Sequence, residues 1–261
     1  MTKAPAATPR GTATACPPLY LLDAIGSLRN RATRNSDILS PVLFILYKAG
    51  PGGPIAADEV HLPLRAGPPA LRARRPHPLQ VEQSFARALE HLGTDVIDSY
   101  LLHGPSWKDG LAAADWEAWR AMEALHEGGR TRLLGVSNFT LEQLQRLCEQ
   151  ARVPPRFVQN RCYASRGWDR GVREFCAAHG MIYQGFSLLT ANRRALAHKE
   201  LARIALRHGR TASQIVFRFA LEVGMIPLTG TSDAGHMRED LDVLAFRLDP
   251  EEVERIERVQ G

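Results

Sequence analysis

Residues 81–261 alternate short apolar runs with amphipathic segments, and this alternation limits the possible folds more than any other feature. The apolar runs have the length of strands, and the segments between them repeat apolar residues at helical spacing. Strands that alternate with helices pair in parallel, which predicts an α/β fold made of βα units. The predicted strands are 96–102, 132–136, 157–160, 181–187 and 225–228, and the predicted helices are 81–92, 116–126, 141–151, 171–179, 196–208, 212–222, 236–244 and 250–259.

Polar residues follow the predicted strands, at the positions His103, Ser137-Asn138, Gln159-Asn160, Ser187 and 229–232. In a (β/α)₈ TIM barrel the carboxyl ends of the strands form the active-site face. We therefore expect these side chains at one end of such a barrel. Five units are visible, so the other three would have to come from the first 80 residues.

Residues 1–80 differ in character from the rest of the chain. They contain ten Lys/Arg against four Asp/Glu, and twelve of the seventeen prolines. Proline interrupts helices, and no amphipathic helix is visible between the few strand-like runs. We expect two parts: an atypical Pro/Arg-rich segment at 1–80 in place of the first barrel units, and a barrel portion at 81–261. The barrel is then incomplete or irregular over its first 80 residues.

Composition and charge exclude several classes of protein. The net charge of +5 comes from residues 1–80, whose arginines lack interleaved aromatic residues, so nucleic acid is not an expected partner. No apolar run reaches eighteen residues, which argues against a membrane-spanning helix. The four cysteines show no metal-binding spacing, so we expect no metal. The N-terminus has no signal-peptide pattern, so a cytoplasmic location is expected. The sequence does not indicate the oligomeric state.

An ordered set of motifs resembles the aldo-keto reductase family. The segments are 93–105 (GTDVIDSYLLHGP), 135–139 (GVSNF), 158–160 (VQN), 185–189 (GFSLL), 226–227 (IP) and 236–241 (HMREDL). The resemblance covers residues 81–261. It implies a (β/α)₈ barrel that binds NADPH and transfers hydride between this cofactor and an aldehyde or ketone, so the expected partner is a small-molecule carbonyl substrate.

The resemblance also implies a catalytic group of Asp, Tyr, Lys and His. In that chemistry a tyrosine hydroxyl protonates the carbonyl oxygen, and a neighbouring ammonium favours loss of the tyrosine proton. His103 matches the histidine. The family's Asp-Thr-Ala…Tyr…Asn-Glu stretch is not found upstream, where Tyr47 and Arg65 are the remaining candidates for the tyrosine and the cation. Catalysis by this chain is therefore expected to be impaired.

The same resemblance assigns cofactor contacts. Ser137, Asn138 and Gln159 match the residues that bind the nicotinamide carboxamide, and Phe186 stands where a tyrosine usually stacks on the ring. The matched loop and C-terminal segment add Ser187, Leu189 and Asn192 for the pyrophosphate, Thr231, Ser232, His236 and Arg238 for the 2′-phosphate, and Glu239 and Asp240 for the adenine. Leu228 replaces the lysine expected after Ile-Pro, so the expected cofactor is NADP, with NAD possible.

Two other functions are compatible with the sequence. The chain could be a non-catalytic nucleotide-binding protein, or a scaffold derived from a reductase barrel. A different barrel enzyme, such as a phosphate-binding isomerase, fits less well because His103 and the GVSNF segment stand where the reductases need them. The carbonyl substrate is not indicated by the sequence.

Overall fold

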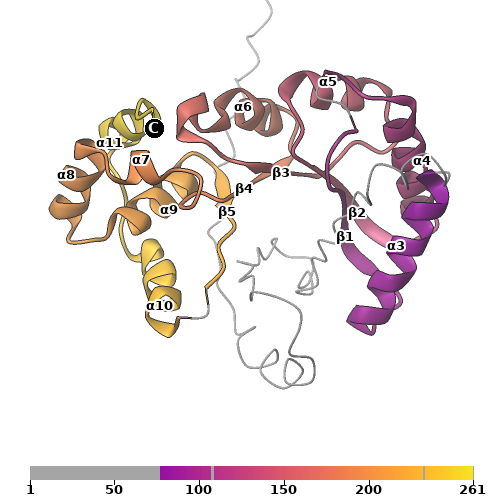
Figure 1. The fold of residues 1–261 in the computed structure, drawn as a ribbon, viewed down its shortest axis with the longest axis horizontal. Helices are drawn as coiled ribbons and strands as arrows, with labels where there is room; N and C mark the ends of the chain where they lie inside the picture. The colour runs from indigo at the N-terminus through magenta and orange to yellow at the C-terminus, as the bar shows by residue number, and fades with distance from the viewer. Residues whose placement is uncertain (1–76, 107–108, 232, 261) are drawn as a thin grey trace, which may run out of the picture.

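The structure is a computed structural model that describes residues 77–106, 109–231 and 233–260 (Figure 1). Tyr47, Arg65 and nearly all of the predicted N-terminal segment lie outside these residues, as does Ser232. The described elements are α3 (His77–Leu92), β1 (Ile97–Leu102), α4 (Ala113–Glu127), β2 (Thr131–Ser137), α5 (Leu141–Gln150), β3 (Phe157–Arg161), η2 (Ala164–Asp169), α6 (Arg170–Ala178), β4 (Ile182–Phe186), α7 (Arg193–Leu196), α8 (Lys199–His208), α9 (Ala212–Glu222), β5 (Met225–Pro227), α10 (Ala234–Asp242), η3 (Val243–Ala245) and α11 (Pro250–Glu257).

The five strands form one parallel sheet in the order β1-β2-β3-β4-β5. A doubly wound sheet reverses its strand order at a switch point, whereas a barrel adds each new strand beside the previous one. The order without reversal is therefore that of a barrel wall. Figure 1 shows the helices arranged along the outer side of this curved sheet.

The core lies between the sheet and its helices. All six residues of β1 are buried, as expected for a parallel strand covered on both faces. Trp119 and Met122 of α4 pack with Leu134 of β2 and Val158 of β3 in one apolar cluster. The alternation of strands and helices predicted for residues 81–261 is confirmed, with boundaries that differ by a few residues.

One predicted helix is divided in the structure. The single helix predicted at 196–208 is in fact the short helix α7 followed by α8. The break occurs at His198, whose extended backbone begins a new helix and whose Nδ1 accepts a hydrogen bond from the Glu200 N–H at 3.2 Å. A histidine that caps a helix gives no sequence signal comparable to that of Ser, Thr or Asp.

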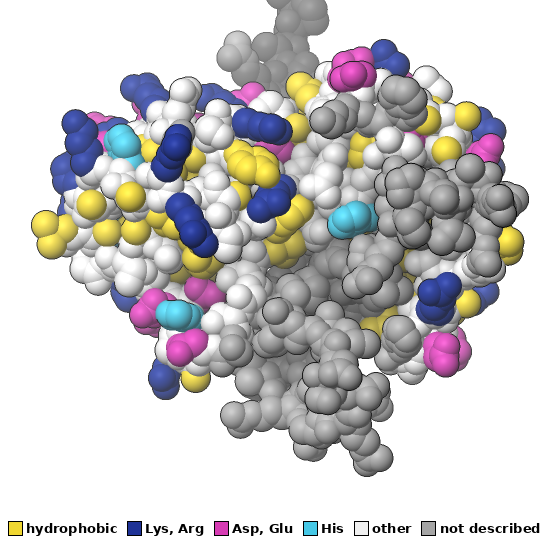
Figure 2. Space-filling view, viewed as in Figure 1, with side chains coloured by type: hydrophobic (Ala, Val, Ile, Leu, Met, Phe, Trp, Pro, Cys, Tyr) yellow, Lys and Arg dark blue, Asp and Glu magenta, His cyan; other side chains and the backbone are white. Residues whose placement is uncertain are grey.

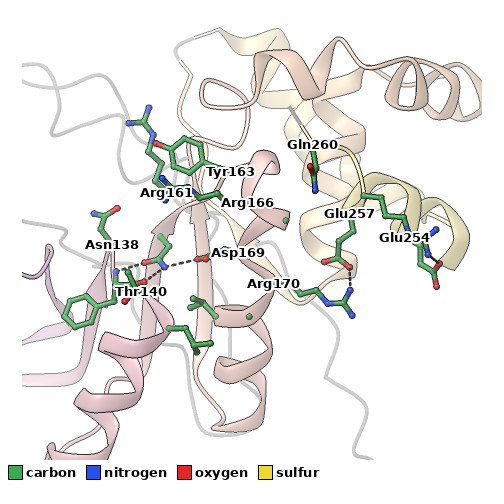
Figure 3. Close-up of a pocket in the computed structure, with 17 residues that line it drawn as sticks. Asn138, Thr140, Arg161, Tyr163, Arg166, Asp169, Arg170, Glu254, Glu257 and Gln260 are labelled. Atoms are coloured by element: carbon green, nitrogen blue, oxygen red, sulfur yellow. Dashed lines mark hydrogen bonds and ion pairs between the residues drawn. The ribbon is translucent and has the colours of Figure 1, made fainter. Parts of the chain in front are cut away.

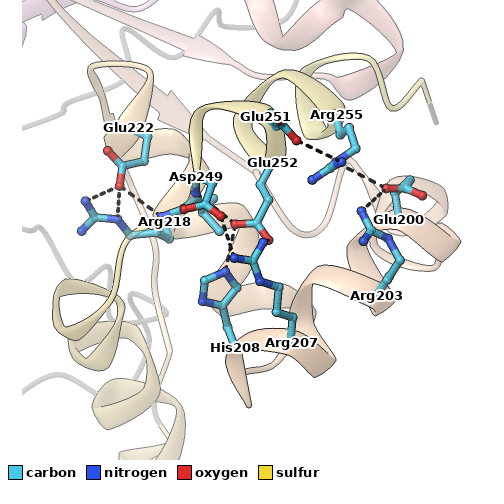
Figure 4. Close-up of polar contacts among 11 residues, drawn as sticks. Glu200, Arg203, Arg207, His208, Arg218, Glu222, Asp249, Glu251, Glu252 and Arg255 are labelled. Atoms are coloured by element: carbon cyan, nitrogen blue, oxygen red, sulfur yellow. Dashed lines mark hydrogen bonds and ion pairs between the residues drawn. The ribbon is translucent and has the colours of Figure 1, made fainter.

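Ion pairs join the C-terminal helices (Figure 4). Glu252 of α11 is 1% exposed and binds Arg207 and His208 of α8, at 3.0 and 2.9 Å. On α9, Arg218 pairs with Glu222 at 2.6 Å. Among the helices in the described part of the chain, none has both the length and the apolar character needed to cross a membrane.

Candidate functional site

A row of residues crosses the sheet near the carboxyl ends of the strands. Ser137 of β2 pairs in register with Gln159 of β3, which pairs with Gln184 of β4, which pairs with Ile226 of β5. Side chains in one row of a parallel sheet point to the same face. The Gln159 Nε2 donates to the Gln184 Oε1 at 3.3 Å, so the amides form a polar layer.

Asn138 connects the ends of three neighbouring strands. Its backbone is left-handed, with φ 59°, a conformation that Asn tolerates better than most residues. Its N–H donates to the Gln159 carbonyl at 2.9 Å, and its Nδ2 donates to the His103 carbonyl at 3.1 Å. The same Nδ2 donates to the Ser137 Oγ at 3.1 Å. The exposed His103 is thereby placed beside the Ser137-Asn138 pair.

A hydrogen-bond network of the buried residues Phe139, Asn160 and Tyr183 and the half-buried Asp169 lies next to this group. The Asn160 Oδ1 accepts from the Phe139 N–H at 3.1 Å, and its Nδ2 donates to the Phe139 carbonyl at 2.7 Å and to the Asp169 Oδ2 at 2.9 Å. The Tyr183 hydroxyl also donates to the Asp169 Oδ2, at 2.7 Å. Burial, followed by the neighbouring Cys162 and Asp169, raises the pKa of Tyr183. The Asn160 side chain therefore joins the end of β3 to the residues after β2 and to η2.

The loop after β4 contains the residues matched to the pyrophosphate contacts. Phe186 is half-buried at the end of β4, and Ser187 follows with φ 57°. Leu189 is half-buried, whereas Asn192 is 3% exposed. The Asn192 Oδ1 accepts from the Ala164 N–H at 2.7 Å, and its Nδ2 donates to the Cys162 and Leu188 carbonyls, both at 2.9 Å. The Asn192 amide thus joins two loops. Its backbone is also engaged, since its N–H donates to the Leu189 carbonyl at 3.1 Å and its carbonyl accepts from the Leu196 N–H at 2.9 Å.

The segment after β5 contains the residues matched to the adenosine end of the cofactor. The Thr229 Oγ1 donates to the Asp240 Oδ2 at 3.1 Å, and Asp240 is 8% exposed. Burial raises the pKa of Asp240. The Glu239 carbonyl accepts from Gln214 at 3.0 Å. His236 and Arg238 are exposed on α10.

The carboxylate of Asp233 caps the N-terminus of α10. The Asp233 Oδ1 accepts from the Gly235 and His236 N–H groups, at 2.7 and 2.9 Å, and these bonds lower the pKa of Asp233. The Thr231 Oγ1 accepts from the Asp233 N–H at 3.1 Å. Free N–H groups at the start of a helix are the groups that bind phosphate. Here a carboxylate of the chain occupies two of them.

The contacts bring together part of the predicted site. His103, Ser137, Asn138 and Gln159 form one connected group at the ends of β1, β2 and β3. The remaining described candidates lie in the loop after β4 and in the segment after β5. The hydrogen bonds described above for these candidates are made to residues outside the His103 group. The sequence analysis did not identify Gln184 as a site residue. Its signal in the sequence is that it is a polar residue within the apolar run 181–187.

Comparison with known proteins identifies the family. The aldo/keto reductase family model matches residues 71–260. The chain belongs to the aldo/keto reductase family. It is 31% identical over 200 residues to aldo-keto reductase family 4 member C11 of Arabidopsis thaliana, covering 70% of this chain and 63% of that protein. It is 29% identical over 187 residues to the NADPH-dependent alpha-keto amide reductase of Saccharomyces cerevisiae, covering 65% of this chain and 57% of that protein.

Solved aldo/keto reductase structures show the same fold. The crystal structure of an aldo-keto reductase from a Medee basin deep-sea metagenome library has a TM-score of 0.62 at 27% identity, covering 68% of this chain and 64% of that one. An aldo/keto reductase from Brucella melitensis has a TM-score of 0.61 at 28% identity, covering 69% and 67%. The predicted (β/α)₈ barrel class is confirmed. The match spans 57–63% of the length of the two curated relatives above.

Proposed function

We propose that this family member binds a nicotinamide dinucleotide across the carboxyl ends of β1–β5. The observation that supports this most is the pair Ser137-Asn138. Among the described residues, the Ser137 O–H and the Asn138 Oδ1 have no hydrogen-bond partner, because the Asn138 Nδ2 makes the contacts to His103 and Ser137. A primary carboxamide offers one acceptor and two donors. The hydroxyl and the amide oxygen fit that pattern.

We assign the other contacts with the dinucleotide to β3, β4 and β5 and the segments that follow them, in chain order. We assign Gln159 to the carboxamide, Phe186 to the nicotinamide face, and Ser187, Leu189 and Asn192 to the pyrophosphate. The adenosine end would meet Thr231, Ser232, His236, Arg238, Glu239 and Asp240. Since the Asp233 carboxylate occupies the first N–H groups of α10, we expect no strong selection of the 2′-phosphate of NADP over NAD.

The proposed reaction is hydride transfer between NADPH and an aldehyde or ketone, with weak turnover. NADPH would supply the hydride. His103, held through its backbone by Asn138, would orient the carbonyl oxygen. The family's Asp, Tyr and Lys have no match in the sequence, so protonation of that oxygen would lack its usual donor. Tyr47 and Arg65 remain candidates outside the described residues.

A tryptophan-fluorescence titration with NADPH and with NADH tests the binding proposal. We expect saturable quenching by both, with dissociation constants within about tenfold, a difference of about 1.4 kcal/mol. Asn138→Gly keeps the left-handed backbone and removes the amide oxygen, so we expect at least about fivefold weaker binding. Gln145→Ala, an exposed change on α5, should leave binding unchanged. Folded protein that shows no quenching would contradict the proposal and favour a scaffold.

A further inference from the structure

Two arginines flank one tyrosine near the proposed cofactor site. Arg161 ends β3, and Arg166 lies in η2. Their guanidinium carbons lie 5.6 and 5.1 Å from the centre of the Tyr163 ring. Figure 3 shows the three side chains close to one another. Both arginines are exposed. Contact with an aromatic face restrains a guanidinium and leaves its N–H donors free for a ligand.

These residues line a pocket of about 780 Å³ between the start of α5, η2, the start of α6 and the end of α11. The pocket also contains three carboxylates, each already engaged. Asp169 accepts from Asn160 and Tyr183, and the other two acidic residues pair with arginines: Glu254 with Arg258, and Glu257 with Arg170 and Arg173.

The pocket lining has four arginines against three acidic residues, so Arg161 and Arg166 leave it with a net positive charge. Within the described part of the chain, neither has a carboxylate at salt-bridge distance. Figure 2 shows both basic and acidic side chains on one face of the molecule.

The wall that contains Arg166 is held in an unusual conformation. Gly167, Trp168 and Asp169 have consecutive left-handed φ values of 65°, 54° and 58°. Left-handed residues normally occur singly, because each non-glycine costs about 1–2 kcal/mol. The Trp168 Nε1 donates to the Ile256 carbonyl of α11 at 3.0 Å, and Asp169 is fixed by Asn160. These contacts fix the end of η2, which directly follows Arg166.

We propose that Arg161, Tyr163 and Arg166 form an anion-binding subsite for a carboxylate or phosphate group. The pocket borders Asn138, which also holds His103, so the anion would lie next to the carboxamide contacts. Two sources of the anion are compatible with that position: a carboxylate on the carbonyl substrate, or a phosphate of the dinucleotide. The position relative to the cofactor rests on the proposed function, whereas the binding of an anion does not.

Isothermal titration of the full chain with terephthalate, a dicarboxylate, tests the subsite without cofactor. We expect saturable binding that weakens as salt is added, and at least about tenfold weaker binding by the R161Q/R166Q double variant. R161K/R166K keeps the charge but loses the forked donors, so it should fall between the two. Arg120→Gln removes an exposed arginine of α4 outside the pocket and is the matched control, with unchanged affinity expected.

Competition separates the two sources of the anion. Terephthalate that binds alongside NADPH supports a substrate carboxylate, and terephthalate that NADPH displaces supports a cofactor phosphate. Terephthalate binding without any NADPH binding leaves the subsite standing and removes the proposed function. Wild-type protein that binds no terephthalate, or a double variant with circular dichroism and affinity equal to the wild type, overturns the subsite.

Discussion

Gly135 lies in β2 at a point where β1 and β3 leave no room for a side chain. A Cβ at this position of β2 would lie 2.8 Å from the Leu101 Cγ and 2.9 Å from the Phe157 carbonyl oxygen. Backbone cannot move aside as the end of a flexible side chain can. The glycine thus sets the spacing of β1, β2 and β3, and two residues later β2 reaches Ser137 of the candidate site.

Gly135→Ala should destabilise the protein by about 1–3 kcal/mol, as overpacking of a core does. Urea unfolding followed by circular dichroism measures this free energy. Gly171→Ala in helix α6 is the matched control. A Cβ there would lie at an ordinary contact distance of 3.5 Å from the Leu141 side chain of α5. In a helix, alanine in place of glycine is neutral or stabilising by up to about 1 kcal/mol. Equal stability of the two variants would contradict the role given to Gly135.

At the scale of elements, helix ends explain much of the local structure. In the sequence, Thr140 with Gln143 and Thr211 with Gln214 have the spacing of a capping box, and each pair forms one in the structure. Glu252 closes a third box by accepting from the Asp249 N–H at 3.0 Å. The same carboxylate also binds α8, so one buried residue both starts α11 and ties it to its neighbour.

Glu252 should make stability depend on acid pH. Burial acts to raise its pKa, but the hydrogen bonds from His208 and the Asp249 N–H and the charge of Arg207 outweigh it, so the pKa is lowered. In the unfolded chain a glutamate titrates near pH ~4.3, so unfolded protein takes up the proton first. This contribution is therefore complete above that pH and is lost as the pH falls through the lower folded pKa.

Glu252→Gln should cost about 1–3 kcal/mol at neutral pH and flatten the loss of stability below pH ~4.3. Urea unfolding at a series of pH values measures both effects. Glu251→Gln is the control, because its side chain is 86% exposed. An unchanged pH slope in the Glu252 variant would show that the carboxylate does not stabilise the fold.

For the whole molecule, the residues matched to the cofactor and three of the four expected catalytic residues (Asp, Tyr and Lys) belong to different parts of a barrel. The described units β1–β5 include His103 and the residues matched to the dinucleotide. The family's Asp, Tyr and Lys are expected in earlier units, and the family model does not extend over residues 1–70. We therefore expect cofactor binding and turnover to be separable in this chain.

We expect the protein to oxidise NADPH with 4-nitrobenzaldehyde at least about a hundredfold more slowly than a family member with all four catalytic residues, the usual cost of losing a positioned proton donor. Loss of NADPH absorbance under saturating aldehyde measures the rate. His103→Asn should lower any remaining rate and leave NADPH affinity within about twofold, since only the His103 backbone carbonyl holds Asn138. A wild-type rate typical of the family would disprove impaired catalysis.

The sequence by itself determined the βα order, the two threonine caps and the family, because hydrophobic period, cap chemistry and ordered motifs are local properties of a chain. Only the tertiary structure decided what each polar residue does. Asn160 and Asn192 read as site residues, yet their amides are used inside the protein. No sequence motif singles out Arg161 and Arg166, yet the structure places both guanidinium groups against the Tyr163 ring. Partners in these contacts come from separate loops, and the side a residue faces is set by strand register and by neighbouring elements.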